Sequence, residues 1–300
     1  MAGLTIPRPA RLTIASMPRG TLYVVATPLG NLADLSPRAA QTLASVDLIA
    51  CEDTRVSRTL LARHGIDRPL VALHEHNERR SARELIARLR EGKTVALISD
   101  AGTPAVSDPG AHLVEEAHRA GITVSPIPGP SAIAAAYSAS GFEGGFLFAG
   151  FLPAGGVERR RAIEALAGSL PVILFEAPHR IARTLSDLLA RFGAERPIVI
   201  GRELTKKFEE VTRLSLGDAP AWLEAEPRRR QGEFVLVLGP GEAASRAAAA
   251  DIDAILDALL EALPPSEAAR IAARVTGLPK KDLYRRALAR RTPGDPASGQ

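Results

Sequence analysis

Short apolar runs alternate with amphipathic segments along the first part of the chain. Residues 21–26, 48–51, 70–73 and 94–98 are apolar enough for buried strands, and each run leads through a polar cluster or loop into a segment with helical spacing. Such alternation is typical of βα units, so we expect a parallel sheet covered by helices. We therefore predict an N-terminal α/β domain over residues 20–140.

The alternation becomes less regular after Gly141, where Gly144-Gly145 and a loop at residues 153–156 interrupt it. Several further apolar runs of strand length follow, at residues 146–151, 172–175, 198–200, 211–216 and 234–238. They predict a second α/β domain over residues 141–240, with antiparallel pairing.

The two ends of the chain differ from the body in charge. Residues 1–19 carry three arginines and no acid, which predicts a flexible basic leader. Residues 241–300 begin with an Ala-rich tract and are predicted to form a linker and a basic helical extension. Within it, residues 266–291 contain eight Lys or Arg against Glu267 and Asp282, and Gly277-Leu278-Pro279 divides them into two short helices.

Two loops rich in Gly, Pro, Ser and Asp follow two of the predicted strands. Residues 99–110 (SDAGTPAVSDPG) come after the strand at 94–98, and residues 126–132 (PIPGPSA) come after the next apolar run. Ligands of open α/β sheets bind at the carboxyl ends of strands, so we expect the two loops to lie side by side around a small molecule. Asp100 then either binds an amine or hydroxyl group of that ligand or caps a turn.

Composition narrows the class of protein. Of 300 residues, 46% are apolar, which suffices for one large core or two medium ones. The single cysteine, Cys51, cannot form an internal disulfide, which fits either a reducing compartment or a fold that needs no disulfide, and we expect a cytoplasmic location. The sequence shows neither a secretory signal nor an apolar stretch near the roughly 20 residues that span a bilayer, so we expect no membrane association.

Several common sites are missing from the sequence. It contains neither G-x-G-x-x-G after the first strand nor G-x-x-x-x-G-K-[ST], so a phosphate held at a helix N-terminus is not expected. Cysteine spacing of the metal-binding kind is absent as well. His74 and His76 would share one side of a strand, which is more typical of a cleft lining or a turn than of a metal site. We predict no bound metal.

A resemblance to a known family rests on segments that occur in one order along residues 20–240. They are residues 21–34 (TLYVVATPLGNLAD), 51–55 (CEDTR), 74–78 (HEHNE), 99–110 (SDAGTPAVSDPG), 128–132 (PGPSA), 150–153 (GFLP) and 201–206 (GRELTK). The chain resembles the ribosomal RNA methyltransferase branch of the tetrapyrrole methylase superfamily. PGPSA is shared across the superfamily, whereas CEDTR, HEHNE and SDAGTP together are specific to this branch.

The resemblance implies a fold and a reaction. The fold would be two α/β domains with a cofactor cleft between them, and a homodimer is implied as well. The cofactor would be S-adenosyl-L-methionine, and the methyl acceptor would be the ribose 2′-hydroxyl of a cytidine in the decoding centre of the small ribosomal subunit. The implied cofactor-binding residues are Pro28, Asp100, Ala101, Gly102, Val106, Ser131, Ala132, Phe175, Glu176 and Leu204.

A protonated ribose hydroxyl is a poor nucleophile, so some group should accept its proton or favour the alkoxide. Glu52, Asp53, His76 and Glu209 are candidates for the base. Arg55, Arg202 and Lys206 are candidates for stabilising charge or holding phosphates. Our predicted catalytic set is Glu52, Asp53, Arg55, His76 and Lys206, although the acids and Arg55 could equally form an internal salt-bridge network.

Basic runs provide candidate contacts to a phosphate backbone. They occur at residues 159–161 and 228–230 and in the C-terminal extension, and the predicted RNA-binding residues are Arg159, Arg160, Arg202, Lys280 and Lys281. The partner would be the small ribosomal subunit or its RNA.

Two other functions remain open. The fold and cofactor could serve methylation of a tetrapyrrole, which the CEDTR and HEHNE segments and the basic tail disfavour. Alternatively, residues 266–291 could be a DNA-binding helix-turn-helix beside a ligand-sensing core, in a protein that is not an enzyme.

Overall fold

The computed structural model describes residues 18–241, 252–276 and 278–290. Its first sheet is parallel throughout, in the order β3-β2-β4-β1-β5. The strands are β1 (Thr21–Val25), β2 (Leu48–Cys51), β3 (Leu70–Ala72), β4 (Val95–Ile98) and β5 (Thr123–Ile127). The predicted parallel sheet is confirmed. A crossover segment joins each strand to the next one along the chain, as parallel pairing requires.

Helices cover both faces of this sheet. They are α1 (Pro37–Ser45), α2 (Thr54–Arg63), α3 (Glu78–Arg90) and α4 (Ala111–Arg119), with a 3-10 turn η1 (Leu32–Asp34) before α1. Leu43 of α1 and Leu60 and Leu61 of α2 pack in a core on one face. Leu85 and Leu89 of α3 pack with Leu113 of α4 in a core on the other face. Apolar positions at helical spacing therefore fix which face each helix covers.

The starts of three helices differ in how they are capped. The Ser36 hydroxyl accepts a hydrogen bond from the Ala39 N–H, and Pro37 opens α1. The Asn77 side chain does not cap α3, because its oxygen accepts from the His74 N–H. Helix α4 begins at Ala111 after Gly110, without a side-chain cap.

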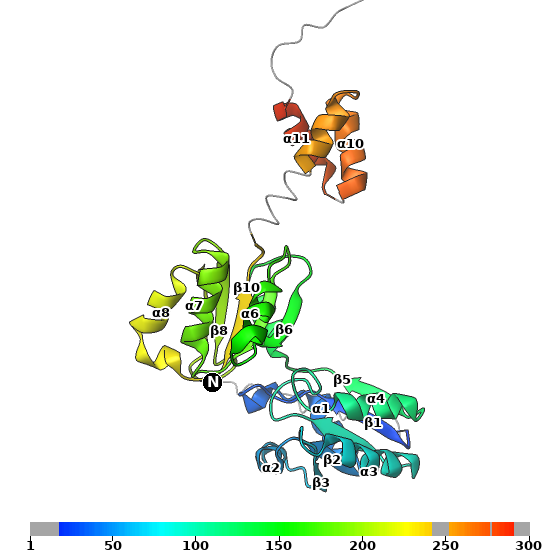
Figure 1. Cartoon of the computed structure of the whole chain (residues 1–300). Coiled ribbons are helices and arrows are strands. Elements are labelled where there is room, and N and C mark those ends of the chain that lie inside the picture. The colour runs from blue at the N-terminus through cyan, green and yellow to red at the C-terminus, as the bar shows by residue number, and fades with distance from the viewer. Residues whose placement is uncertain (1–17, 242–251, 277, 291–300) are drawn as a thin grey trace, which may run out of the picture.

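The second sheet is mixed and has the order β6-β7-β10-β8-β9. Its strands are β6 (Leu147–Phe151), β7 (Val172–Glu176), β8 (Pro197–Arg202), β9 (Glu210–Ser215) and β10 (Phe234–Leu238). The predicted antiparallel pairing is found in β7–β10, β10–β8 and β8–β9, while β6 and β7 are parallel. Figure 1 shows the two sheets in separate lobes.

The two faces of the second sheet are covered differently. One face packs on α6 (Gly156–Glu164), α7 (Ile181–Phe192) and α8 (Ala219–Ala225), and the 3-10 turn η2 (Pro227–Arg230) follows α8. The other face carries α5 (Ala132–Ser138), whose Ala136 is buried against Ile173, Val199 and Val237. Helix α5 therefore packs on the second sheet, although the predicted boundary at residue 141 assigned it to the first domain.

The C-terminal extension is helical where the structure describes it. Residues 252–260 are helical, and α10 (Pro265–Thr276) and α11 (Lys280–Arg290) follow, close to the two short helices predicted. Leu256, Ala269, Ala272, Leu283 and Ala287 form a core of their own. The predicted leader and most of the predicted linker lie outside the described residues. In the part of the chain that is described, no helix is long and apolar enough to cross a membrane.

Candidate active site

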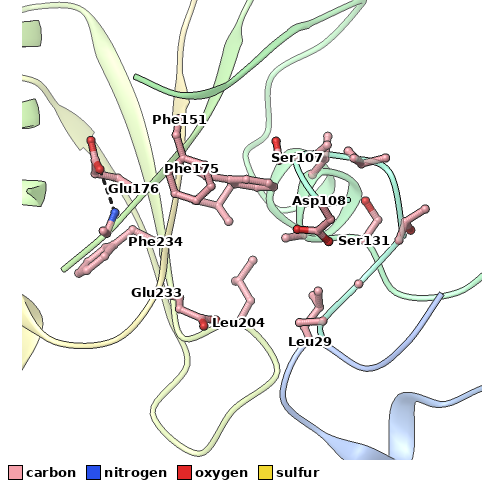
Figure 2. Close-up of a pocket in the computed structure, with 18 of the residues that line it drawn as sticks. Leu29, Ser107, Asp108, Ser131, Phe151, Phe175, Glu176, Leu204, Glu233 and Phe234 are labelled. Carbon is pink, nitrogen blue, oxygen red and sulfur yellow. Dashed lines mark hydrogen bonds between the residues drawn. The ribbon is translucent and has the colours of Figure 1, made fainter. Parts of the chain in front are cut away.

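A cavity of about 310 Å³ is lined by residues of both lobes (Figure 2). One side of the cavity is formed by Leu29 after β1, by the β4–α4 loop and by the start of α5. The other side is formed by β6, β7, the β8–β9 loop and β10 of the second sheet. Its lining residues are Leu29, Ala101, Gly102, Thr103, Val106, Ser107, Asp108, Ser131, Ala132, Ile133, Phe151, Phe175, Glu176, Ala177, Pro178, Leu204, Glu233, Phe234 and Val235. A volume of this size is in the range that small-molecule cofactors occupy.

The β4–α4 loop is tied to its neighbours on both sides. The Thr27 N–H donates to the Gly102 carbonyl at 2.8 Å, and the Gly102 N–H donates back to the Thr27 carbonyl at 3.1 Å. The Thr103 hydroxyl donates to the Pro130 carbonyl of the β5–α5 loop at 3.1 Å. The prediction that the two loops lie side by side is thus confirmed, and hydrogen bonds fix their relative position.

Strained backbone is concentrated in two loops that line the cavity. Ala105 and Ser107 of the β4–α4 loop have φ of 64° and 66°, and Glu203 and Thr205 of the β8–β9 loop have φ of 50° and 67°. Left-handed conformations are unfavourable for residues other than glycine and persist where surrounding structure imposes them. The residues with strained backbone therefore lie in the same two loops that line the cavity.

The second lobe contributes an apolar wall. The Phe175 ring lies 5.1 Å from the Phe148 ring and 5.6 Å from the Phe151 ring, both edge-on. Register pairing of β10 with β7 sets Phe234 opposite Glu176 and Val235 opposite Phe175. Such a surface suits the flat face of an aromatic group of a ligand.

Glu176 lines the cavity, but its carboxylate belongs to an internal network. One carboxylate oxygen accepts from the Ala177 N–H at 2.9 Å and lies 3.1 Å from the Arg180 guanidinium, and the other accepts from the Thr184 hydroxyl at 2.5 Å. The side chain is fully buried. The Glu176 carboxylate therefore holds the segment after β7 in place and is not free to bind a ligand in the cavity.

The β8–β9 loop reaches across to the first lobe. Lys206 Nζ lies 2.9 Å from carboxylate oxygens of both Glu203 and Glu233, and the Asn31 N–H donates to the Thr205 hydroxyl at 3.2 Å. Burial works against the charge of Lys206, but the two carboxylates outweigh it and raise the pKa of the ammonium. Glycine is needed at position 30, because a Cβ there would lie 2.3 Å from Lys206 Cγ.

Carboxylates gather behind the β4–α4 loop. The Asp53 N–H donates to an Asp100 side-chain oxygen at 3.1 Å. Burial raises the pKa of the Glu52 carboxyl, and the negative charges of Asp108 and Asp100 act in the same direction. Burial likewise raises the pKa of Asp108, which lines the cavity. Hydrogen bonds from Arg55 instead lower the pKa of Asp53 to about 2, so the paired Asp53 is a weak base.

The structure places the predicted cofactor residues close to one another. Eight of the ten line the cavity, namely Ala101, Gly102, Val106, Ser131, Ala132, Phe175, Glu176 and Leu204. Pro28 is buried outside the lining, and the Asp100 carboxylate faces the Asp53 backbone.

The predicted catalytic residues lie around the cavity rather than in its lining. Glu52 and Asp53 follow β2, and the exposed Arg55 forms an ion pair with Asp53 at 2.6 Å. His76 is exposed in the segment after β3, where its ring centroid lies 6.1 Å from that of His74. Among the described residues, no three His, Cys, Asp or Glu side chains are arranged to hold a metal ion.

Two of the predicted RNA contacts are wrong. Arg159 is 2% exposed, and its guanidinium binds Asp187, the Thr184 hydroxyl and the Pro153 carbonyl. Arg202 is 5% exposed, and its guanidinium donates to the carbonyls of Phe208, Arg228 and Gln231. Both side chains are saturated by protein acceptors. The run at 228–230 is also neutralised, by Glu226, Glu210 and Glu224. Arg160, Lys280 and Lys281 are exposed.

Several lining residues were not predicted. Leu29, Ser107, Asp108 and Phe151 lie in segments that the resemblance already singled out, so their proximity to the site could have been inferred. Phe234 and Val235 carried no such signal, because only the pairing register of β10 with β7 brings them to the cavity.

Comparison with known proteins identifies this fold. The sequence model for Tetrapyrrole (Corrin/Porphyrin) Methylases matches residues 21–220, which contain both sheets except β10. The chain belongs to the tetrapyrrole methylase family. A second model, for the RsmI C-terminal HTH domain, matches residues 246–291 of this tetrapyrrole methylase. The chain is therefore a methyltransferase, and the alternative of a protein that is not an enzyme is wrong.

Curated relatives of this tetrapyrrole methylase share most of its length. Proteins named ribosomal RNA small subunit methyltransferase I include one from Mesorhizobium japonicum, 51% identical over 89% of this chain and 91% of that protein. Another, from Xylella fastidiosa, is 49% identical over 88% of this chain and 98% of that protein. One from Escherichia coli O157:H7 is 43% identical over 90% and 95%.

Solved structures confirm the fold at low sequence identity. A cobalt precorrin-4 methyltransferase has a TM-score of 0.55 and 18% identity, covering 74% of this chain and 98% of that one. A uroporphyrin-III C-methyltransferase from Thermus thermophilus has a TM-score of 0.52 and 23% identity, covering 74% and 94%. The predicted pair of α/β domains of the tetrapyrrole methylase type is confirmed.

Proposed function

We propose that this protein methylates the RNA of the small ribosomal subunit, using S-adenosyl-L-methionine as methyl donor and the ribose 2′-hydroxyl of a decoding-centre cytidine as acceptor. The observation that carries the proposal is identity of 42–51% over about nine-tenths of the chain to proteins named ribosomal RNA small subunit methyltransferase I. The tetrapyrrole enzymes of similar fold are 18–23% identical, so they support the architecture and not their own substrate.

The cavity suits S-adenosyl-L-methionine. A related fold, the uroporphyrin-III C-methyltransferase from Thermus thermophilus, was solved with S-adenosyl homocysteine. Gly102 has a φ of 81°, and a Cβ there would lie 3.1 Å from Leu29 Cδ2, so glycine is favoured at this position of the cavity lining. Loops of Ala, Gly, Ser and Thr suit a polar amino-acid portion, and the wall of Phe151, Phe175 and Val235 suits an adenine ring. Asp100 would hold the β4–α4 loop in position, because its carboxylate accepts a hydrogen bond from the Asp53 N–H.

When bound, the cofactor supplies a methyl group already activated on a sulfonium, so the protein has to align the acceptor and take up its proton. We assign proton uptake to the carboxylates beside the β4–α4 loop, Glu52 or Asp108. Their pKa values are raised by burial, which makes them stronger bases than Asp53. Arg55 and His76 are exposed and available to the acceptor strand. Lys206 acts by holding Glu233 and the β8–β9 loop at the cavity.

Arg160, Lys280 and Lys281 are exposed cations that can contact RNA phosphates. We propose a homodimer, supported by the exposed apolar Leu147 of the edge strand β6, which is 46% exposed. We also propose a cytoplasmic location, which follows from a ribosomal substrate.

The proposal is tested by methyl transfer. Purified protein is incubated with radiolabelled S-adenosyl-L-methionine and either small ribosomal subunits from cells that lack this activity or uroporphyrinogen. We expect label on subunit RNA and none on the tetrapyrrole. Cofactor binding with no transfer to subunits would overturn the ribosomal assignment, and transfer to uroporphyrinogen would replace it.

A further inference from the structure

Exposed arginines lie in the N-terminal halves of two helices in the first domain. Arg58 lies in the second turn of α2, and Arg79 and Arg80 lie in the first turn of α3. We call these three residues the arginine rim. No described carboxylate lies within 4.0 Å of any of the three guanidinium groups, and no described acceptor binds them.

This placement works against helix stability. The N-terminal end of a helix carries a partial positive charge, so cations there are unfavourable and acids favourable. At the start of α2 the N-cap Asp53 supplies an acid, and Arg58 lies beyond the first turn, so this cost does not apply to Arg58. In α3 the first-turn acid is Glu78, whose carboxylate accepts from the N–H groups of Gly110 and His112. Arg79 and Arg80 therefore carry an electrostatic cost, and neither forms an ion pair with a described carboxylate.

Both helix starts are joined to the loop that lines the cavity. Asp53, the N-cap of α2, is bonded through its N–H to Asp100, at one end of the β4–α4 loop. Glu78, the first residue of α3, binds Gly110 at 2.9 Å, at the other end of that loop. The starts of α2 and α3, the two helices that carry the arginine rim, thus flank the β4–α4 loop on both sides.

We propose that the arginine rim binds the phosphate backbone of the RNA substrate and holds the acceptor strand against the cavity. This inference rests on the proposed function and names the surface that the substrate occupies. Helices α2 and α3 pack on opposite faces of the sheet, so one small anion cannot contact both starts, whereas a strand with regularly spaced phosphates can. Arginine keeps its charge at any working pH and binds phosphate oxygens in pairs.

The same two helices provide a matched control. Arg63 lies in the last turn of α2, and Arg88 and Arg90 lie in the last turn of α3; all three are exposed and, among the described residues, unpaired. The last turn of α3 is about 15 Å from its first, at 1.5 Å per residue. The triple variant R58Q/R79Q/R80Q and the control R63Q/R88Q/R90Q therefore remove equal charge from the same helices.

The test measures methyl transfer to small subunits and the salt dependence of subunit binding by the full chain. We expect the rim variant to lose at least about tenfold in kcat/KM through KM, and its slope of log affinity against log salt to fall by about 2. The control should keep both values. The rim variant should also keep its affinity for the cofactor and unfold at no lower temperature than wild type, because Arg79 and Arg80 oppose the helix dipole and none of the three arginines forms an ion pair with a described carboxylate.

The outcomes separate this inference from the proposed function. If wild type transfers no methyl group to subunits, the proposed function fails. If wild type is active and the rim variant matches the control in KM and salt slope, the arginine rim does not bind RNA. Equal losses in both variants would mean that net charge alone matters and would also overturn the inference.

Discussion

Arg159 and Arg160 are neighbours in one basic run and have opposite environments. Arg160 is exposed, whereas Arg159 is buried and bridges Asp187, Thr184 and the loop at Pro153. Thr184 in turn donates to Glu176, so the contacts continue to the cavity. A buried arginine of this kind is structural, and removing it leaves unpaired partners.

We therefore expect Arg159→Ala to lower the free energy of unfolding by about 2–4 kcal/mol. Arg160→Ala, the matched control, should change it by no more than about 0.5 kcal/mol. Urea denaturation followed by circular dichroism measures both. Equal small effects of the two substitutions would show that the network around Arg159 carries no stability.

Asp108 combines burial with a place in the cavity lining. Because its pKa is raised in the folded state, ionising it destabilises the fold. The penalty is absent below the unfolded pKa of about 4 and is complete above the raised native pKa. Asp108→Asn should therefore gain stability relative to wild type as pH rises from 4 to 7, while losing methyl transfer if Asp108 takes up the proton. A stability difference that shrinks with rising pH would contradict the first expectation.

At the scale of elements, the β8–β9 loop and the segment after β1 form a contact between the lobes that depends on Gly30. The aliphatic part of the Lys206 side chain packs against Gly30, and its ammonium group forms ion pairs with Glu203 and Glu233. Because Leu204 and Glu233 line the cavity, displacing Lys206 should disturb the cofactor site without unfolding either sheet.

Gly30→Ala is expected to weaken cofactor affinity about tenfold, equivalent to about 1.4 kcal/mol. Gly168→Ala is the control, since a Cβ there meets nothing within 4 Å. Isothermal titration calorimetry with S-adenosyl-L-methionine gives both dissociation constants. Unchanged affinity in Gly30→Ala would show that Lys206 has no influence on the cavity.

The sequence predicts some elements better than others for physical reasons. Strands of the first sheet and helices such as α7 are visible because burial on one or both faces leaves a regular apolar pattern. Helices α5 and α8, each of 7 residues, were not predicted because one or two turns give too few apolar repeats. Residues of the site also differ in how far the sequence predicts them. Loop residues 101–106 were predictable from composition. Phe234 and Val235 reach the cavity only through the pairing of β10 with β7, and Arg202 is buried through contacts with distant carbonyls.

At the scale of the whole molecule, separate cores support separate roles. Among the residues that the structure describes, the cores of both sheets contain none from the C-terminal extension, which has a core of its own. The described residues that line the cavity likewise all lie between Leu29 and Val235. Cofactor binding and the C-terminal extension should therefore be separable by deletion.

A chain ending at residue 241 should bind S-adenosyl-L-methionine within about twofold of the full chain and show a higher KM for small subunits, since Lys280 and Lys281 are lost. Calorimetry and methyl-transfer kinetics measure the two quantities. Loss of cofactor affinity would contradict the separation, and an unchanged KM would show that the extension does not contact the substrate.

The position of the transferred methyl group in the RNA tests the proposed activity most directly. Small subunits labelled by this enzyme from radiolabelled S-adenosyl-L-methionine are digested to nucleosides, and the labelled nucleoside is identified by mass spectrometry after its position in the RNA is found by protection of fragments. We expect a single labelled cytidine of the decoding centre that carries the methyl group on its ribose. Label on a base, or on a nucleotide outside the small-subunit RNA, would contradict it.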